Sequence, residues 1–359
     1  MKKILFICPY PYGVAAGQRL KFEPHYSRLR EKGYEVKIHS FMHKKLWSKV
    51  YKKGYVFTKI FWTLIGFLRR ITLIFSLRNY DCVYIFMTVF PFGPPILERM
   101  YRFFSKKIIY DLEDDMFIDE PEKEENRIAS FFKSKSKYQF LVSSSDHVIT
   151  SSPFLTKKCE DISKKKHAHF IAPTLEIDRF SEKPIVQDNN EKVVIGWTGT
   201  VGSKVFVDEF IPILEKLHDI CDFKLMVIGN FEMTHSFLDL EMVQWNAYDE
   251  VSQLHNFDIG IYPLPSNDWI GGKSGLKALQ YMSIGIPPVC SAVGNVLNFI
   301  ENDEDGILIY NEDDWLLNLE SLVRDKKKRQ NMGKKARIKF LKDFSQESIF
   351  QQYFDLIES

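Results

Sequence analysis

Short apolar segments alternate with amphipathic segments along the whole chain. Helical periodicity marks segments such as 18–32, 207–217 and 277–283, and these separate most of the apolar runs. This alternation predicts parallel sheets with helices on both faces. The predicted strands are 4–8, 36–40, 82–87, 108–111, 147–150, 193–197, 224–228, 259–262, 289–291 and 307–309.

A polar segment divides the alternating pattern into two halves. Residues 187–192 read QDNNEK and directly precede a predicted strand. A chain of 359 residues is long enough for two domains. We therefore predict an α/β protein with two Rossmann-like domains, at 1–187 and 188–345, which face a central cleft.

Charge and cysteine usage exclude several functions. The net charge of +2 is too small to indicate nucleic acid as a partner. None of the five cysteines has C-x-x-C spacing, and Cys8, Cys82 and Cys290 lie in strand-like apolar runs. We interpret these three as reduced core residues of a cytoplasmic protein, and we predict no metal bound by cysteine. The sequence has no uncharged apolar run of roughly 18 residues, so no helix is expected to span a membrane.

The segment 44–77 is both basic and apolar. Residues 55–77 are mostly aromatic and aliphatic and contain no acidic residue, and five lysines precede them. This composition is typical of an interfacial element that anionic lipid attracts. It equally fits a pair of core helices broken near Gly66, because a Rossmann-like domain needs apolar helices on its sheet.

Loops that follow strands are where ligands bind in parallel α/β folds. In the first such loop, residues 13–19, small residues let the backbone approach a phosphate or sugar, and Arg19 adds a fixed positive charge. Alternatively, Gly13 and Gly17 only shape the turn. Neither this loop nor residues 196–202 has the G-x-G-x-x-G spacing, which disfavours a nicotinamide cofactor.

A second loop, at residues 272–277, places two lysines at the start of an amphipathic helix. Unpaired amide groups and the helix dipole favour an anion there, and Lys273 and Lys277 can add charge from one face. The alternative is that both lysines are solvated on an exposed helix face.

The loop after the fourth predicted strand is acidic. Asp111, Glu113, Asp114 and Asp115 lie within five residues. Three interpretations fit this pattern: a metal site, a solvated turn that caps a helix, or carboxylates that orient an acceptor hydroxyl and take its proton.

The order of several segments resembles one enzyme family. Residues 195–200, 256–264, 272–289, 291–295 and 305–308 resemble successive parts of the group 1 (GT4) glycosyltransferases, which have the GT-B fold. The resemblance implies retaining transfer of a sugar from a nucleotide diphosphate sugar to a glycan or lipid-linked acceptor, in surface polysaccharide or glycoconjugate synthesis, without a metal or other cofactor. Two alternatives remain: a non-catalytic nucleotide-sugar-binding assembly partner and a sugar-nucleotide epimerase.

The resemblance also assigns roles to parts of the chain. Residues 1–187 become the acceptor side and 188–345 the donor domain, and the terminal helix at 346–359 crosses back to the first domain. From the cysteines we predict a cytoplasmic location. Peripheral binding of residues 44–77 to the inner face of an anionic membrane is one of the two interpretations of that segment given above.

Individual donor contacts follow from the same resemblance. Lys204 fits a diphosphate-binding lysine, whereas Thr200 stands where many members have arginine. The paired glutamates of the family correspond to Gly272 and Gln280. Gln280 can still bind ribose hydroxyls, and Asp268 is a substitute for the missing carboxylate. The predicted catalytic residues are Asp114, Asp115, Lys204 and Lys273, and the predicted donor-binding residues are Gly17, Arg19, Gly199, Thr200, Lys204, Asp268, Lys273, Ser274, Gly275, Leu276, Lys277 and Gln280.

Overall fold

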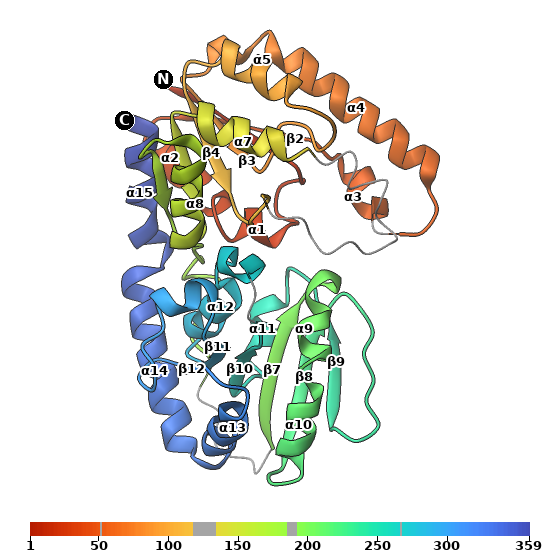
Figure 1. Ribbon diagram of the computed structural model, residues 1–359, viewed down its shortest axis with the longest axis vertical. Helices are drawn as coiled ribbons and strands as arrows, with labels where there is room; N and C mark the ends of the chain where they lie inside the picture. The colour runs from red at the N-terminus through yellow and green to blue at the C-terminus, as the bar shows by residue number, and fades with distance from the viewer. Residues whose placement is uncertain (51, 118–133, 185–191, 266–267) are drawn as a thin grey trace. The chain divides into compact units, whose positions relative to one another are not determined.

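The computed structural model describes all residues except 51, 118–133, 185–191 and 266–267 (Figure 1). The chain forms two compact units. The first comprises 1–173, 271–273 and 349–359, and the second comprises 174–270 and 274–348. The domain boundary predicted at residue 187 lies outside the described residues, and the first segment of the first unit ends at Pro173.

A six-stranded parallel sheet forms the centre of the first unit, in the order β2-β1-β3-β4-β5-β6. Its inner strands are buried along almost their whole length, which explains their continuous apolar runs. The strands are β1 (Lys3–Cys8), β2 (Glu35–Ser40), β3 (Cys82–Phe86), β4 (Ile108–Leu112), β5 (His147–Thr150) and β6 (Ala168–Phe170). The helices are α1 (Ala16–Arg19), η1 (Glu23–His25), α2 (Tyr26–Glu31), α3 (Lys44–Val50), α4 (Val56–Ile74), η2 (Leu77–Asn79), α5 (Ile96–Phe104), α7 (Lys135–Ser144), α8 (Pro153–Ser163) and most of α15 (Gln346–Glu358).

The second unit has its own six-stranded parallel sheet, in the order β12-β11-β10-β7-β8-β9. The predicted α/β architecture of two parallel sheets is thus confirmed. The strands are β7 (Val193–Gly199), β8 (Phe223–Gly229), β9 (Leu240–Gln244), β10 (Ile259–Tyr262), β11 (Pro288–Ser291) and β12 (Ile307–Ile309). The helices are η4 (Val201–Ser203), α9 (Lys204–Asp208), α10 (Ile211–His218), α11 (Glu250–Leu254), η5 (Asp268–Gly272), α12 (Leu276–Ser283), η6 (Gly294–Asn298), α13 (Asp314–Arg324) and α14 (Lys326–Asp343).

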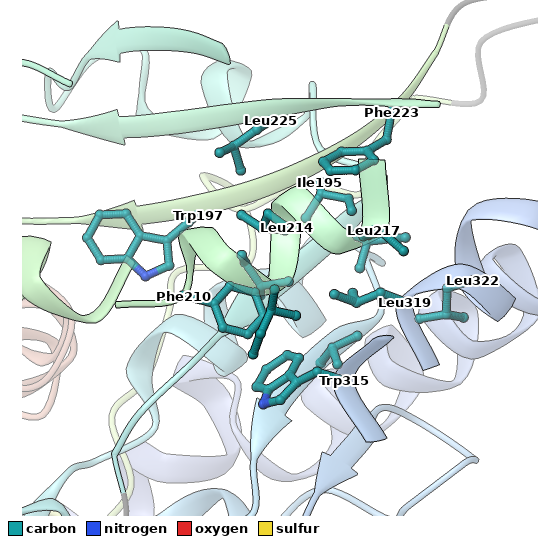
Figure 2. Packing of buried hydrophobic residues seen from close by; sticks show 14 of the residues in the cluster. Ile195, Trp197, Phe210, Leu214, Leu217, Phe223, Leu225, Trp315, Leu319 and Leu322 are labelled. Carbon is teal, nitrogen blue, oxygen red and sulfur yellow. The ribbon is translucent and has the colours of Figure 1, made fainter. Parts of the chain in front are cut away.

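Apolar side chains from β7, α10 and α13 fill one face of this second sheet (Figure 2). The rings of Phe210 and Trp315 meet edge to face with centroids 4.5 Å apart. Trp197 at the end of β7 is completely buried. This packing fixes the strand ends from which the following loops leave.

Two predictions about helices were wrong. The helix expected at 18–32 is divided into α1, η1 and α2, because Pro24 has no N–H to continue a helical ladder. The helix expected at 207–217 is interrupted between α9 and α10, where Pro212 lies in the first turn of α10. The break near Gly66, which one of the two interpretations of residues 44–77 included, is absent, because α4 runs without interruption from Val56 to Ile74. None of the helices in the described part of the chain is long and apolar enough to cross a membrane.

Candidate functional site

The loop between β1 and α2 is fixed by a buried amide. Gln18 accepts a hydrogen bond from the Tyr10 N–H (3.0 Å) and donates to the Tyr10 carbonyl (3.2 Å) and to Glu23 (3.0 Å). Glu23 in turn accepts the Gly13 N–H at 2.9 Å. Burial raises the pKa of Glu23, although the hydrogen bond from Gln18 opposes this. These bonds hold the predicted small-residue turn in one conformation.

Gly17 lies against the carboxylate of Glu113. A Cβ atom at position 17 would lie only 2.0 Å from the Glu113 Oε2 atom, so no larger residue fits without moving that side chain. Arg19 is only 7% exposed and lies at the end of α1. The roles of Gly17 and Arg19 in donor binding stay predictions.

Asp111, the first acid of the acidic loop, is part of the core. It is completely buried and accepts hydrogen bonds from the Lys21 ammonium group and the Tyr84 hydroxyl. Burial raises the pKa of Asp111, and the charge of Lys21 opposes this. Lys21 is itself only 1% exposed, so the ammonium and carboxylate groups form an ion pair that is buried from solvent.

The next three acids have different surroundings. Asp115 is buried and accepts hydrogen bonds from the Phe117 N–H (3.0 Å) and the Lys158 ammonium group (2.6 Å). The more exposed Asp114 forms an ion pair with Lys273 at 3.0 Å, within the first unit. Among the described residues, no three side chains of His, Cys, Asp or Glu gather into a metal-binding group.

Glu113 is the acid whose protonation is most perturbed. Burial raises its pKa to about 7, and the neighbouring charge of Asp114 adds to this effect. A carboxyl group that titrates near neutral pH can accept or donate a proton under ordinary conditions. The sequence interpretation chose Asp114 and Asp115 instead. Glu113 was missed because its contact with Gly17 joins segments that are far apart in the chain.

Replacing Glu113 with glutamine should make unfolding less sensitive to pH. An unfolded glutamate has a pKa of about 4.3, so the folded state binds this proton more tightly. The resulting stabilisation is complete at acidic pH and is lost as pH rises to about 7. The free energy of unfolding of Glu113→Gln, measured relative to that of wild type, should therefore be about 1–2 kcal/mol higher at pH 8 than at pH 5. Urea unfolding at both pH values measures this, and an unchanged difference between the two proteins would contradict it.

In the second unit, the predicted residues after β7 form a tight turn. Gly199 ends the strand, and Thr200 and Ser203 cap η4 reciprocally, with the Thr200 N–H donating to the Ser203 hydroxyl at 3.0 Å. Lys204 forms an ion pair with Asp208, with oxygens at 2.6 and 2.7 Å. Its ammonium group is therefore held on the surface of α9, and its role on a diphosphate stays a prediction.

The loop before α12 is also well defined. Gly275 precedes the helix with φ of 76°, a left-handed conformation that favours glycine. The Asn295 amide donates to the Ser274 carbonyl at 3.0 Å and holds the loop from the other side. The helix begins at Leu276. Because Gly275 has no side chain, it cannot cap the N–H groups of the first turn. Such a helix start favours an anion.

Lys277 lies at the carboxyl ends of two strands. Its ammonium group is 5.6 Å from the ring centroid of Trp197 in β7 and 5.2 Å from that of Tyr262, the last residue of β10. Ligands of parallel α/β sheets bind at these ends. The structure thus places Lys277 and the start of α12 beside Trp197 of β7 and Tyr262 of β10, and the turn at Gly199 follows β7. That these segments form one donor site stays a prediction.

Gln280 belongs to a buried polar network. It is 6% exposed and donates to Glu250 at 3.3 Å, and Glu250 also accepts from Arg179 (2.9 Å) and from the Trp245 ring N–H (3.3 Å). Sequence reasoning missed Glu250, which has no motif around it. The ribose contact of Gln280 stays a prediction, and the side chain of Asp268 lies outside the described residues.

Gly272, at the position of a family glutamate, has little room for a side chain. A Cβ atom there would lie 3.1 Å from both the Cβ and the N atom of Asp115. A larger residue at this position would therefore need Asp115 to shift slightly.

Comparisons with known proteins agree with this geometry. Residues 178–339 match the family model of glycosyl transferases group 1, whereas a search of curated proteins gives no match. Among solved structures, sucrose-phosphate synthase from Thermosynechococcus elongatus has a TM-score of 0.72 at 14% identity, covering 100% of this chain and 98% of that one.

Two further solved structures are similar over their full lengths. Anabaena HepE in complex with UDP and glucose has a TM-score of 0.66 at 13% identity, covering 100% of both chains. The lipopolysaccharide outer core galactosyltransferase WaaB has a TM-score of 0.60 at 14% identity, covering 99% of both. The chain therefore has the GT-B fold of these glycosyltransferases, and residues 178–339 carry the match to the group 1 family.

Proposed function

We propose that this protein is a retaining glycosyltransferase that uses a nucleoside diphosphate sugar. The observation that carries the proposal is the position of Lys277, which lies beside the uncapped start of α12 and at the ends of β7 and β10. The group 1 family model covers this same part of the chain. Since HepE has been solved with UDP and with UDP-glucose, UDP is the first nucleotide to test.

In the proposed reaction, the bond between the anomeric carbon and the diphosphate oxygen breaks while an acceptor hydroxyl attacks from the same face. The hydroxyl proton passes to the departing diphosphate. Lys277 and the first-turn amides of α12 stabilise the charge that develops on that diphosphate, as an electrostatic mechanism requires. Lys273 and Lys204 would add charge after leaving their present partners, Asp114 and Asp208. We propose that no metal ion is needed, because these groups supply the positive charge.

We propose a glycan or lipid-linked acceptor in surface polysaccharide or glycoconjugate synthesis, used on the cytoplasmic side of a membrane. The acidic loop is the proposed acceptor side. Asp115 is already bonded to Lys158 and to the Phe117 N–H, so it positions the loop. Glu113 and Asp114 remain to orient the acceptor hydroxyl.

A non-catalytic nucleotide-sugar-binding protein is the second candidate, and Gly272 favours it. The family's carboxylate is absent at this position, and a Cβ atom there would lie only 3.1 Å from the Cβ and N atoms of Asp115. The purified protein should be incubated with a panel of nucleotide sugars, with and without glycan acceptors, and free nucleotide diphosphate measured. Release of the diphosphate supports the enzyme. Donor binding with no release would favour the non-catalytic protein, and a changed nucleotide sugar would indicate an epimerase.

Asp114→Asn should reduce transfer much more than donor binding, because we place this carboxylate on the acceptor side. A tenfold or larger fall in kcat with less than a threefold change in donor Kd is expected, corresponding to more than about 1.4 kcal/mol in the chemical step. A chelator should leave wild-type activity unchanged. Activity that a chelator abolishes and manganese restores would show that the loop binds a metal.

A further inference from the structure

The face of α4 that points away from the first sheet carries large apolar side chains. Phe57 is 90% exposed, and Phe61, Leu64 and Leu68 are each more than half exposed. These positions recur every three or four residues, so they form one stripe along the helix. Such a stripe is unusual on a monomer, in which exposed apolar residues are normally scattered.

The opposite face of α4 is firmly attached to the first unit. Arg70 is completely buried, and its guanidinium group donates to the backbone carbonyls of His39 and Cys8, both at 2.8 Å. A Cβ atom at Gly66 would lie 2.8 Å from the Phe41 ring, so the helix approaches that residue closely. These contacts fix the rotation of α4 about its axis, and the apolar stripe therefore faces away from the first unit.

Basic residues surround the stripe. Residues 36–80 include ten lysines and arginines but no aspartate or glutamate, although the whole chain carries a net charge of only +2. In α3, which packs beside α4, the Lys45 ammonium group lies 5.7 Å from the Trp62 ring and that of Lys49 lies 4.3 Å from the Tyr55 ring. Aromatic rings with basic neighbours are typical of side chains at the boundary between water and lipid.

A second exposed stripe lies on α5, which also packs against α4. Ile96, Met100 and Phe103 are spaced three and four residues apart, and Phe103 is 75% exposed. The Tyr101 hydroxyl of α5 donates to the Arg70 carbonyl of α4 at 2.9 Å. The apolar surface thus involves two helices that are joined rigidly.

We propose that the α3–α4 surface, at residues 44–50 and 52–77, binds the interface of a bilayer that contains anionic lipid, with the α4 stripe inserted among the acyl chains. The charge pattern selects this occupant. In a symmetric dimer the surface would meet itself, and basic residues would face basic residues with no acidic partner within 36–80. Anionic headgroups supply the missing charge, and the acyl chains accept the apolar stripe.

Membrane binding by this surface would keep the enzyme beside a lipid-linked acceptor. The biological role of the surface therefore rests on the proposed function. The physical binding does not depend on the sugar donor. A vesicle experiment and a nucleotide titration therefore succeed or fail separately.

The full-length protein should be sedimented with vesicles of phosphatidylglycerol and phosphatidylcholine, and with vesicles of phosphatidylcholine alone. We expect sedimentation with the anionic vesicles only, weakening at least tenfold as salt rises from about 0.05 M to about 0.5 M, because salt screens exposed charges. Absence of the wild type from the anionic pellet at low salt would overturn the proposal.

Phe57→Asp should reduce binding to anionic vesicles at least tenfold. The matched control is Leu317→Asp, because Leu317 is 68% exposed on α13 of the second unit, and this variant should sediment like wild type. Both variants should keep the wild-type thermal midpoint and the same response to UDP. Equal sedimentation of the two variants would contradict the proposal, as would a wild-type dimer that Phe57→Asp dissociates in sedimentation velocity.

Discussion

Replacing Lys21 with methionine should lower the free energy of unfolding by about 3–5 kcal/mol, because Asp111 would be left buried without a cation. Asp111 is completely buried, and Lys21 and Tyr84 are the donors to its two oxygens. Burial already raises the pKa of Asp111 in the native protein, and loss of Lys21 removes the main opposing effect. Urea unfolding at neutral pH gives the change directly.

A matched surface pair controls for the loss of a lysine. Lys335 pairs with Glu304, and both side chains are more than half exposed. Lys335→Met should therefore cost less than about 1 kcal/mol. The double variant Lys21→Met, Asp111→Asn should recover part of the loss, since it removes the unpaired charge. Equal costs for Lys21→Met and Lys335→Met would show that the buried pair does not stabilise the fold.

The sequence allowed the two parallel sheets to be predicted because their inner strands are buried on both faces and read as continuous apolar runs. The strands β6 and β9 were missed because they do not read as continuous apolar runs. β6 has only three residues and includes His169. β9 contains Glu241 and Gln244, and none of its five residues is fully buried. The ends of helices were predicted less well. The helical spacing of apolar residues continues past Pro24, although the helix itself is interrupted there.

The candidate site could be predicted where it depends on local chemistry. The glycine turn and lysines before α12 are close in sequence, and the structure places them at the ends of β7 and β10 as expected from the parallel sheet. The raised pKa of Glu113 could not be predicted, because it depends on how deeply the fold buries this side chain and on the nearby charge of Asp114. Likewise, the partners of Lys204 and Gln280 depend on side-chain positions that no motif specifies.

Replacing Lys277 with alanine should weaken the binding of a nucleoside diphosphate tenfold or more. A charge-assisted contact to the diphosphate contributes about 1.5–3 kcal/mol when it is shielded from water, and the rings of Trp197 and Tyr262 provide that shielding. Lys273→Ala should also weaken binding, because this lysine adjoins the same helix start. Lys277→Arg keeps the charge and should retain more affinity than the alanine variant.

The most direct test of the donor site is isothermal titration of wild type, Lys277→Ala, Lys273→Ala and a control variant with UDP. The control is Lys342→Ala, since Lys342 is an exposed lysine in the last turn of α14 in the same unit. UDP carries the diphosphate charge without the sugar, so it isolates the contact in question. The proposed site predicts tenfold or weaker binding by the two loop variants and wild-type affinity for the control. Wild-type affinity for UDP in both loop variants would contradict the assignment of a diphosphate site to the start of α12.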